Sequence, residues 1–431
     1  MRPVTQHELE CELAAAAGGS QPRVVASGNH AAPRALLEAL ERSVERYRLF
    51  MLAAPAPLPQ REGVILETPF VGPGMREAGD RLDYLPMRLS LVPRLFATMR
   101  APDIVLLNAS LPRAGRVSLG IEVNVLVSAV EQVRARGGLV VAQLNSRMPY
   151  TFGDGELDAD AIDLAIEVDE QLPSPSPGDG HTDADAIAAL VAALVEDGST
   201  LQLGIGQIPD ATLRALADHR RLEIWSEMIS DGVMELDRGG ALEPSAPIVC
   251  SFLFGSPEFY EWVDANPRLR MARTETTNDP ALIAAHPRMV SVNSALAVDL
   301  RDQAGASHIN GRLYSGFGGQ PDFVVGALHS RGGHAVIALR SWHQKTNHST
   351  IVPRLLDPVT SFQHSAVVTE QGCAEIFGRS QRAQAQLIID RAAHPDARAW
   401  LREEAAAMGL RSARRRQEGT QQANAPSGSA A

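Results

Sequence analysis

Short apolar runs alternate along this chain with segments of helical periodicity, and the alternation occurs twice. The first half contains RVVASG, GVILET, DIVLLNAS and GLVVAQLN, and the second contains TLQLGIG, LEIWSEM and GGHAVIALRSW among others. Runs that are apolar throughout are typical of strands in a mostly parallel sheet that helices cover on both faces. The pattern therefore predicts an α/β protein built from two open-sheet domains of similar design.

A stretch rich in Pro, Ser, Gly and Asp, residues 171–185, separates the two series. Such a segment without apolar periodicity is typical of a linker or long loop. We expect one domain over residues 23–175 and a second over 184–410. The first 20 or so residues look like an Ala/Gly-rich lead-in, and the polar composition of residues 411–431 predicts a disordered tail. Helices are expected over residues 33–52, 122–138 and 184–197.

Charge and cysteine content narrow the functional class. The formal net charge of −11 among 431 residues argues against binding to nucleic acid or to an anionic membrane. Three well-separated cysteines, Cys11, Cys250 and Cys373, exclude a disulfide framework and a CxxC zinc module, and they suit the cytoplasm. Neither a signal peptide nor a membrane helix is expected.

Two glycine-rich turns stand between an apolar run and a helical segment. The first, LGIGQIP, contains Gly204, Gly206 and Gln207, and the second, SGFGGQP, contains Gly316, Gly318, Gly319 and Gln320. The backbone amides of such a turn can bind an anion or a developing oxyanion. The first turn fits neither a Walker A loop nor a dinucleotide fingerprint. Each turn taken alone is equally compatible with a plain structural loop.

Carboxylates follow two of the apolar runs. Glu227 ends LEIWSE and Glu370 follows SAVVT. The carboxyl end of a parallel strand is where open α/β sheets place their sites, and a carboxylate there can act as a nucleophile or a base. A helix cap or an ion pair is the alternative for Glu227, and a helix N-cap is the alternative for Asn278. The histidines lack the spacing of a zinc site.

The order of the motifs is more specific than any one of them. LNSRMPYTFGDG, LQLGIGQIPDA, WSEMISDGV, TNDPALI, SGFGGQPDF and VVTEQGCAEIFG occur in this sequence over nearly the whole chain. The series resembles the acetyl-CoA hydrolase/transferase family, and within it the 4-hydroxybutyrate CoA-transferase type of class I CoA-transferases. Three departures from the usual pattern are Asp302 in place of Gly, Gln371 in place of an aromatic residue, and Trp342.

The resemblance implies an active site in the cleft between the two domains. It implies that Glu227 is the nucleophile, that Asn278 holds this Glu or the substrate carboxylate, and that the two glycine turns approach CoA and the reacting carbonyl. A transferase of this kind passes CoA from an acyl-CoA to a small carboxylic acid through a glutamyl-CoA thioester, without a metal or other cofactor.

Alternatives remain open at this point. An acyl-CoA hydrolase would use the same Glu227 and let water take the acyl group. A catalytically silent acyl-CoA-binding protein and, on fold analogy alone, a sugar-phosphate isomerase are the other candidates. The acyl donor, the acceptor acid and the oligomeric state, a homodimer included, are left open.

Overall fold

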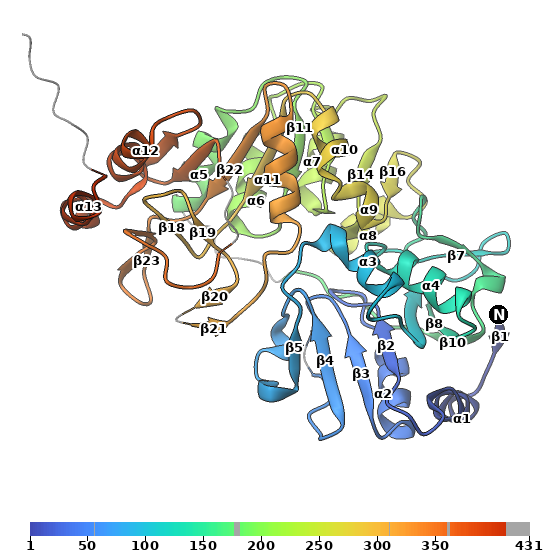
Figure 1. Cartoon of the computed structure of the whole chain (residues 1–431). Coiled ribbons are helices and arrows are strands. Elements are labelled where there is room, and N and C mark those ends of the chain that lie inside the picture. The colour runs from blue at the N-terminus through green and yellow to red at the C-terminus, as the bar shows by residue number, and fades with distance from the viewer. Residues whose placement is uncertain (56, 176–181, 310, 360–362, 411–431) are drawn as a thin grey trace, which may run out of the picture.

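The computed structural model describes residues 1–55, 57–175, 182–309, 311–359 and 363–410 (Figure 1). The first half of the chain lies in the lower part of this view and the second half above it. Within the described residues each half contains one eight-stranded sheet. The two α/β halves with open sheets confirm the fold class expected from the sequence.

The sheet of the first half is parallel throughout. Its strands, in spatial order, are β1 (Arg2–Pro3), β10 (Leu164–Val168), β8 (Leu139–Asn145), β6 (Ile104–Ala109), β2 (Arg23–Ala26), β3 (Tyr47–Phe50), β4 (Val64–Thr68) and β5 (Leu82–Tyr84). Helices α1 (Gln6–Ala17), α2 (Arg34–Ser43), α3 (Val92–Ala97) and α4 (Leu126–Ala135) accompany it.

The sheet of the second half is parallel except for its last strand pair. Its strands, in spatial order, are β16 (Leu269–Met271), β14 (Ile248–Cys250), β12 (Glu223–Trp225), β11 (Thr200–Leu203), β17 (Met289–Asn293), β22 (His334–Ala338), β26 (Ala366–Thr369) and β27 (Gly372–Glu375). The helices of this half are α5 (Thr182–Ala192), α6 (Gln207–Ala215), α7 (Asp231–Arg238), α8 (Pro257–Val263), α9 (Thr274–Thr277), α10 (Pro280–Ala285), α11 (Gln320–His329), α12 (Gln381–Leu387) and α13 (Pro395–Ala407).

Short strands lie outside the two sheets. They are β7 (Arg116–Ser118) with β9 (Glu156–Asp158), β13 (Met228–Ile229) with β15 (Phe252–Leu253), β18 (Ala297–Asp299) with β19 (Ala304–Gly305) and β25 (Ile351–Val352), β20 (His308–Ile309) with β21 (Arg312–Leu313), and β23 (Trp342–His343) with β24 (His348–Ser349). No helix among the described residues is long and apolar enough to cross a membrane.

Three local expectations were wrong. Residues 6–17 are not a lead-in but the helix α1, which begins with a capping box in which Thr5 and Glu8 satisfy each other's backbone amides. The helix expected over residues 33–52 ends at Ser43, and its last residues form β3. The helix expected from residue 122 begins at Leu126. The linker between the sheets and the tail after residue 410 fall partly or wholly outside the described residues.

Both sheets have a point where the strand order reverses, and such a point opens a crevice at the carboxyl ends of the strands. In the first half it lies between β2 and β6, and in the second between β11 and β17. A continuous hydrophobic core includes residues of both halves, for example Val25, Phe50, Leu201 and Val336. The strand ends next to these reversals therefore belong to one packed body.

Candidate active site

Glu227 lies in the turn that follows β12, at the carboxyl end of the second sheet. The hydroxyl of the preceding residue, Ser226, donates to the carbonyl of Leu203 at the end of β11, 3.1 Å away. The main-chain carbonyl of Glu227 accepts hydrogen bonds from the amides of Ser251 (2.8 Å) and Phe252 (3.0 Å). The backbone of Glu227 is thus fixed from two neighbouring strands, while its side chain is only partly buried.

Asn278 holds the carboxylate of Glu227. Its Nδ2 donates to Glu227 Oε2 over 3.0 Å, and its Oδ1 accepts from the hydroxyl of Thr277 over 2.8 Å. The hydroxyl of Thr277 therefore fixes which end of the amide faces Glu227. The N-cap reading of Asn278 was wrong, because Asp279 caps α10 by accepting from the amide of Ala281.

The second glycine turn packs directly against this pair. A Cβ atom on Gly319 would lie 1.7 Å from Glu227 Oε2 and 2.3 Å from Asn278 Nδ2, so only glycine fits there. Gly318 has a left-handed φ of 51° and lies against the ring of Phe70, and a Cβ on Gly316 would meet the carbonyl of Pro69. The turn therefore joins the nucleophile candidate to the first half of the chain. Gln320 follows as the first residue of α11.

The first glycine turn lies at the end of the neighbouring strand β11. Gly204 lines a small cavity together with Ser226, and a Cβ built on it meets nothing within 4 Å. Gly206 has a φ of 115° and is the N-cap of α6. Gln207 starts that helix and accepts a hydrogen bond from Arg340 over 2.8 Å. The backbone of this turn is thus beside Glu227 in the sheet and has open space around it.

Burial governs the ionisation of two carboxyl groups here. Desolvation raises the pKa of Glu227 to about 7, and the hydrogen bond from Asn278 only partly offsets this. Desolvation also raises the pKa of Asp322, in α11, to about 6. Asp322 accepts from the hydroxyl of Ser90 (2.9 Å), which belongs to the first half of the chain. A substantial share of Glu227 is therefore protonated at neutral pH.

A segment of the first half crosses to the second half at this site. In this crossing segment, residues 121–124, Val123 and Asn124 donate to the carbonyl of Ser251, and the carbonyl of Ile121 accepts from Leu253. Ser251 and Phe252 from this stretch hold the backbone of Glu227. The first half is thus hydrogen-bonded to the strand that positions the nucleophile candidate.

The sequence reasoning missed the polar residues that this segment brings in. Glu122 is buried, and its Oε1 accepts from Asn29 Nδ2 (2.8 Å) and Asn124 Nδ2 (2.9 Å). Desolvation raises the pKa of Glu122 to about 7. The sequence does contain a signal, a carboxylate within the apolar run LGIEVNVL. The helical periodicity of the following residues led us to assign Glu122 to the expected helix instead.

A small cavity opens onto Glu227 between the two halves. It has a volume of about 70 Å³, and its lining comes from both halves of the chain: Asn29, Leu52, Phe70, Leu89, Asn124, Glu227, Phe252 and Gly318. The predicted site residues Glu227 and Gly318 line it directly. Asn278 and Gly319 stand behind Glu227, and the first glycine turn is not part of this lining.

The rival carboxylate Glu370 has a different environment. It accepts from the amide of Ser341 (2.9 Å), from the hydroxyl of the same residue and from Gln371 Nε2 (3.1 Å). These hydrogen bonds hold its pKa below the ordinary value in spite of burial. Its oxygens are occupied by local partners, which suits a structural role. In the part of the chain that the structure describes, no group of three or more His, Cys, Asp or Glu residues could hold a metal ion.

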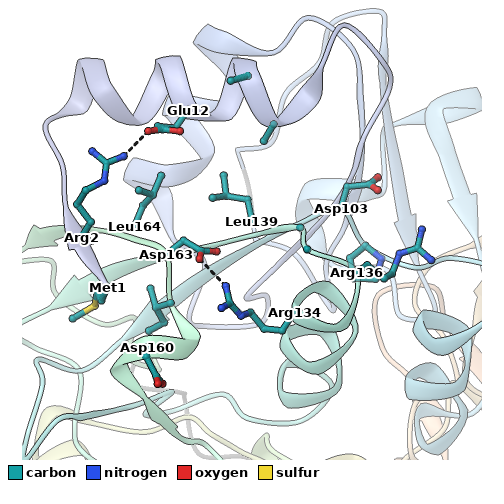
Figure 2. Close-up of a pocket in the computed structure, with 16 residues that line it drawn as sticks. Met1, Arg2, Glu12, Asp103, Arg134, Arg136, Leu139, Asp160, Asp163 and Leu164 are labelled. Carbon is teal, nitrogen blue, oxygen red and sulfur yellow. Dashed lines mark hydrogen bonds and ion pairs between the residues drawn. The ribbon is translucent and has the colours of Figure 1, made fainter.

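A larger hollow, of about 960 Å³, lies at the amino ends of β8 and β10 (Figure 2). Arg134 pairs there with Asp163 over 2.6 Å, and Arg2 pairs with Glu12. None of the site residues predicted from the sequence lines this hollow. Of these two hollows, only the smaller cavity is bordered by predicted site residues, Glu227 and Gly318.

Comparison with known proteins identifies the family. Residues 255–405 match the model of the acetyl-CoA hydrolase/transferase C-terminal domain. The chain is 39% identical to the 4-hydroxybutyrate coenzyme A transferase of Clostridium kluyveri, over 78% of this chain and 80% of that protein. The chain belongs to the acetyl-CoA hydrolase/transferase family.

Further relatives agree with this assignment. The succinyl-CoA:acetate/propanoyl-CoA:succinate CoA transferase of Fasciola hepatica is 34% identical over 86% of this chain and 82% of that protein. The crystal structure of 4-hydroxybutyrate CoA-transferase from Porphyromonas gingivalis has a TM-score of 0.79 and 31% identity, covering 94% of this chain and 98% of that one. RipA from Yersinia pestis has a TM-score of 0.84 at 27% identity, over 94% and 100%. The chain is thus an enzyme of the CoA-transferase and acetyl-CoA hydrolase kind.

Proposed function

We propose that this enzyme transfers CoA from an acyl-CoA to a short carboxylic acid through a glutamyl-CoA thioester on Glu227. The observation that carries the proposal is the arrangement around one carboxylate. Glu227 borders a cavity built by both halves, Asn278 holds its Oε2, and Gly319 lies against it. Similarity to 4-hydroxybutyrate and other short-chain CoA-transferases supports the same substrate class.

The reaction needs only this carboxylate and backbone donors. Ionised Glu227 attacks the thioester carbonyl, the CoA thiolate leaves, and a mixed acyl-glutamyl anhydride forms. The thiolate then attacks the glutamyl carbonyl, which releases the first carboxylic acid and leaves glutamyl-CoA. A second carboxylate attacks this thioester and reverses the sequence. No metal or redox cofactor takes part in these steps.

The anhydride and thioester steps both develop negative charge on a carbonyl oxygen. The two glycine-rich turns end at the N-termini of α6 and α11, where the helix dipole favours such charge. One oxyanion donor contributes about 3–4 kcal/mol in comparable enzymes. Gly319 places the start of α11 against Glu227, so the second turn serves the glutamyl carbonyl and the open first turn serves CoA.

The decisive experiment replaces Glu227 by Gln. Gln cannot form the anhydride, so turnover should fall on the order of a thousandfold or more, the scale seen when a nucleophile is removed. Wild-type protein given acyl-CoA without acceptor should gain the mass of CoA on the peptide containing Trp225 to Met228. Glu370→Gln is the matched control and should still form this adduct. An adduct on the Glu370 peptide, or near-normal turnover of Glu227→Gln, would refute the assignment.

Kinetics separate the transferase from the hydrolase, whose names also occur among the relatives. A covalent enzyme-CoA form that outlives departure of the first acid requires ping-pong kinetics, so double-reciprocal plots at several acceptor concentrations should be parallel. Intersecting lines would indicate a ternary complex. If free acid appears steadily and added carboxylate does not accelerate CoA exchange, the enzyme is a hydrolase.

A further inference from the structure

A second carboxyl group lies next to the pair formed by Glu227 and Asn278. Asp322 is in the first turn of α11, and its backbone amide donates to the carbonyl of Gly319, the residue that packs against Glu227 Oε2. Asn278, which donates to Glu227 Oε2 over 3.0 Å, also gives Asp322 a weaker hydrogen bond. The two carboxyl groups therefore share one amide side chain.

The first half of the chain supports the charge of Asp322. The hydroxyl of Ser90 donates to Asp322 Oδ1 over 2.9 Å, and the amide of Ser90 donates to Oδ2 over 3.3 Å. Arg88 Nη1 lies 3.9 Å from Oδ1. Helix α10, which packs against α11, contains no ionisable side chain. Because burial raises the pKa of Asp322 only to about 6, this fully buried side chain is an anion at pH 8.

The charge of Asp322 acts on Glu227. Desolvation is the main cause of the raised pKa of Glu227, and Asp322 is the one charged group of the described residues that raises it further. Two like charges in a desolvated site repel each other, and the repulsion ends when one of them becomes neutral. Glu227 becomes neutral in the proposed reaction, because its carboxylate and the acyl-CoA yield glutamyl-CoA and a free carboxylate. The negative charge leaves with the released acid.

We infer that the charge of Asp322 favours the covalent CoA form of Glu227 over its free carboxylate. In the free enzyme Glu227 and Asp322 are two neighbouring anions, whereas in glutamyl-CoA only Asp322 is charged. The inference rests on the proposed function and deepens it, since the covalent form is the one proposed above. Asp322 does not line the cavity beside Glu227 and acts through Glu227, so it is a positioning residue.

The test measures the equilibrium of the half-reaction at pH 8, where both carboxyl groups are largely ionised. Enzyme is mixed with acetyl-CoA and acetate in several ratios, and mass spectrometry gives the fraction that carries CoA on Glu227. Asp322→Asn removes the charge, and its amide can still pair with the hydroxyl and the amide of Ser90. The equilibrium constant for adduct formation should fall at least about threefold. The midpoint of the pH profile of kcat/KM should fall by about half a pH unit or more, because both quantities report the same repulsion.

Two further variants separate charge from packing. Ser90→Ala removes a hydrogen-bond donor but leaves Asp322 ionised at pH 8, so the equilibrium constant should not fall. Asp163→Asn is the matched control. Asp163 likewise accepts from a backbone amide, that of Val140 (2.9 Å), and from an arginine, Arg134 (2.6 Å), but it lies at the amino ends of the first sheet. This variant should change neither the equilibrium constant nor the pH midpoint.

Failure of the inference and failure of the proposed function give different results. If the adduct forms on wild-type Glu227 but Asp322→Asn changes neither quantity, the inference is wrong and the proposed function stands. An equal fall of the equilibrium constant in Ser90→Ala would also overturn the inference, because that variant keeps the charge. Asp322→Ser is a second neutral variant and decides the question if Asp322→Asn does not fold.

If no adduct forms on the wild-type enzyme, the proposed function fails. The pH midpoint of acyl-CoA hydrolysis then tests Asp322, and an unchanged midpoint in Asp322→Asn would overturn the inference independently. The absence of both adduct and hydrolysis would overturn the two together.

Discussion

At the scale of single residues, the surroundings of Glu227 disfavour the ionised carboxylate that the proposed reaction needs. Its pKa of about 7 lies above the ordinary value of 4.5 because the carboxylate is desolvated. The folded protein therefore holds this proton more tightly than the unfolded chain. The free energy of unfolding falls as the pH rises from about 4.5 to about 7, because the unfolded chain ionises first.

Glu227→Gln should consequently be more stable than the wild type above pH 7, by at most about 3 kcal/mol for a shift of this size. The difference should shrink to about 0.4 kcal/mol at pH 4.5, where the folded carboxyl is neutral and the unfolded one is half ionised. Urea unfolding of the two proteins at pH 4.5, 6 and 8 measures it. In the wild type, kcat/KM should decline as the pH falls below about 7, since the proposed mechanism requires ionised Glu227 to attack. A stability difference that does not change with pH would contradict the desolvation argument.

At the scale of elements, the turn before α11 has a steric requirement that the turn before α6 lacks. A Cβ on Gly319 would overlap Glu227 Oε2, whereas a Cβ on Gly204 meets nothing within 4 Å. Gly319→Ala should therefore displace the carboxylate and lower kcat on the order of a hundredfold. Gly204→Ala should keep the melting temperature of the wild type and act chiefly on the KM for acyl-CoA. Equal losses of kcat in both variants would contradict this division of roles.

Elements with a strong apolar pattern could be predicted from the sequence, and those set by long-range contacts could not. GVILET and DIVLLNAS are strands as expected, because each contains three or four consecutive apolar residues, VIL and IVLL. Residues 47–50 have helical periodicity but form β3 between β2 and β4, where sheet pairing overrides the local preference.

The same limit applies to the site. The motif order placed Glu227, Asn278 and the second glycine turn at one site, and the geometry brings them together. Their catalytic roles stay predictions. Glu122 and Asn29 are 93 positions apart in the chain, so no local spacing connects them. Asp322 depends in the same way on Ser90, 232 positions away.

At the scale of the whole molecule, the crossing segment makes the position of Glu227 dependent on both halves. Residues 121–124 are hydrogen-bonded to residues 251–253, and Ser251 and Phe252 hold the main chain of Glu227. A chain cleaved between residues 175 and 182 should keep its activity while the halves stay associated. Separately expressed halves should be inactive alone, form no CoA adduct on Glu227, and recover activity on mixing, as measured by turnover after gel filtration. Full activity of the second half alone would contradict this dependence.

The structure explains how Asp302 can occupy a position where the family usually has Gly. It adopts a φ of 61°, the left-handed conformation that favours the glycine usual at this place. Its side chain is buried and accepts from the backbone amide of His364 (2.7 Å), and its Oδ1 lies 2.6 Å from His364 Nδ1. The local backbone shape is thus retained, and the carboxylate has a partner.

This pairing constrains the evolutionary route to the present sequence. A glycine ancestor that gained Asp302 before His364 would have passed through a form with a poorly satisfied buried carboxylate, at a cost of roughly 1–3 kcal/mol. The histidine gained first would likewise have buried an imidazole without this carboxylate, because His364 is 1% exposed. Among homologues, Asp at this position should therefore occur together with His at the other, and either one without the other should be rare.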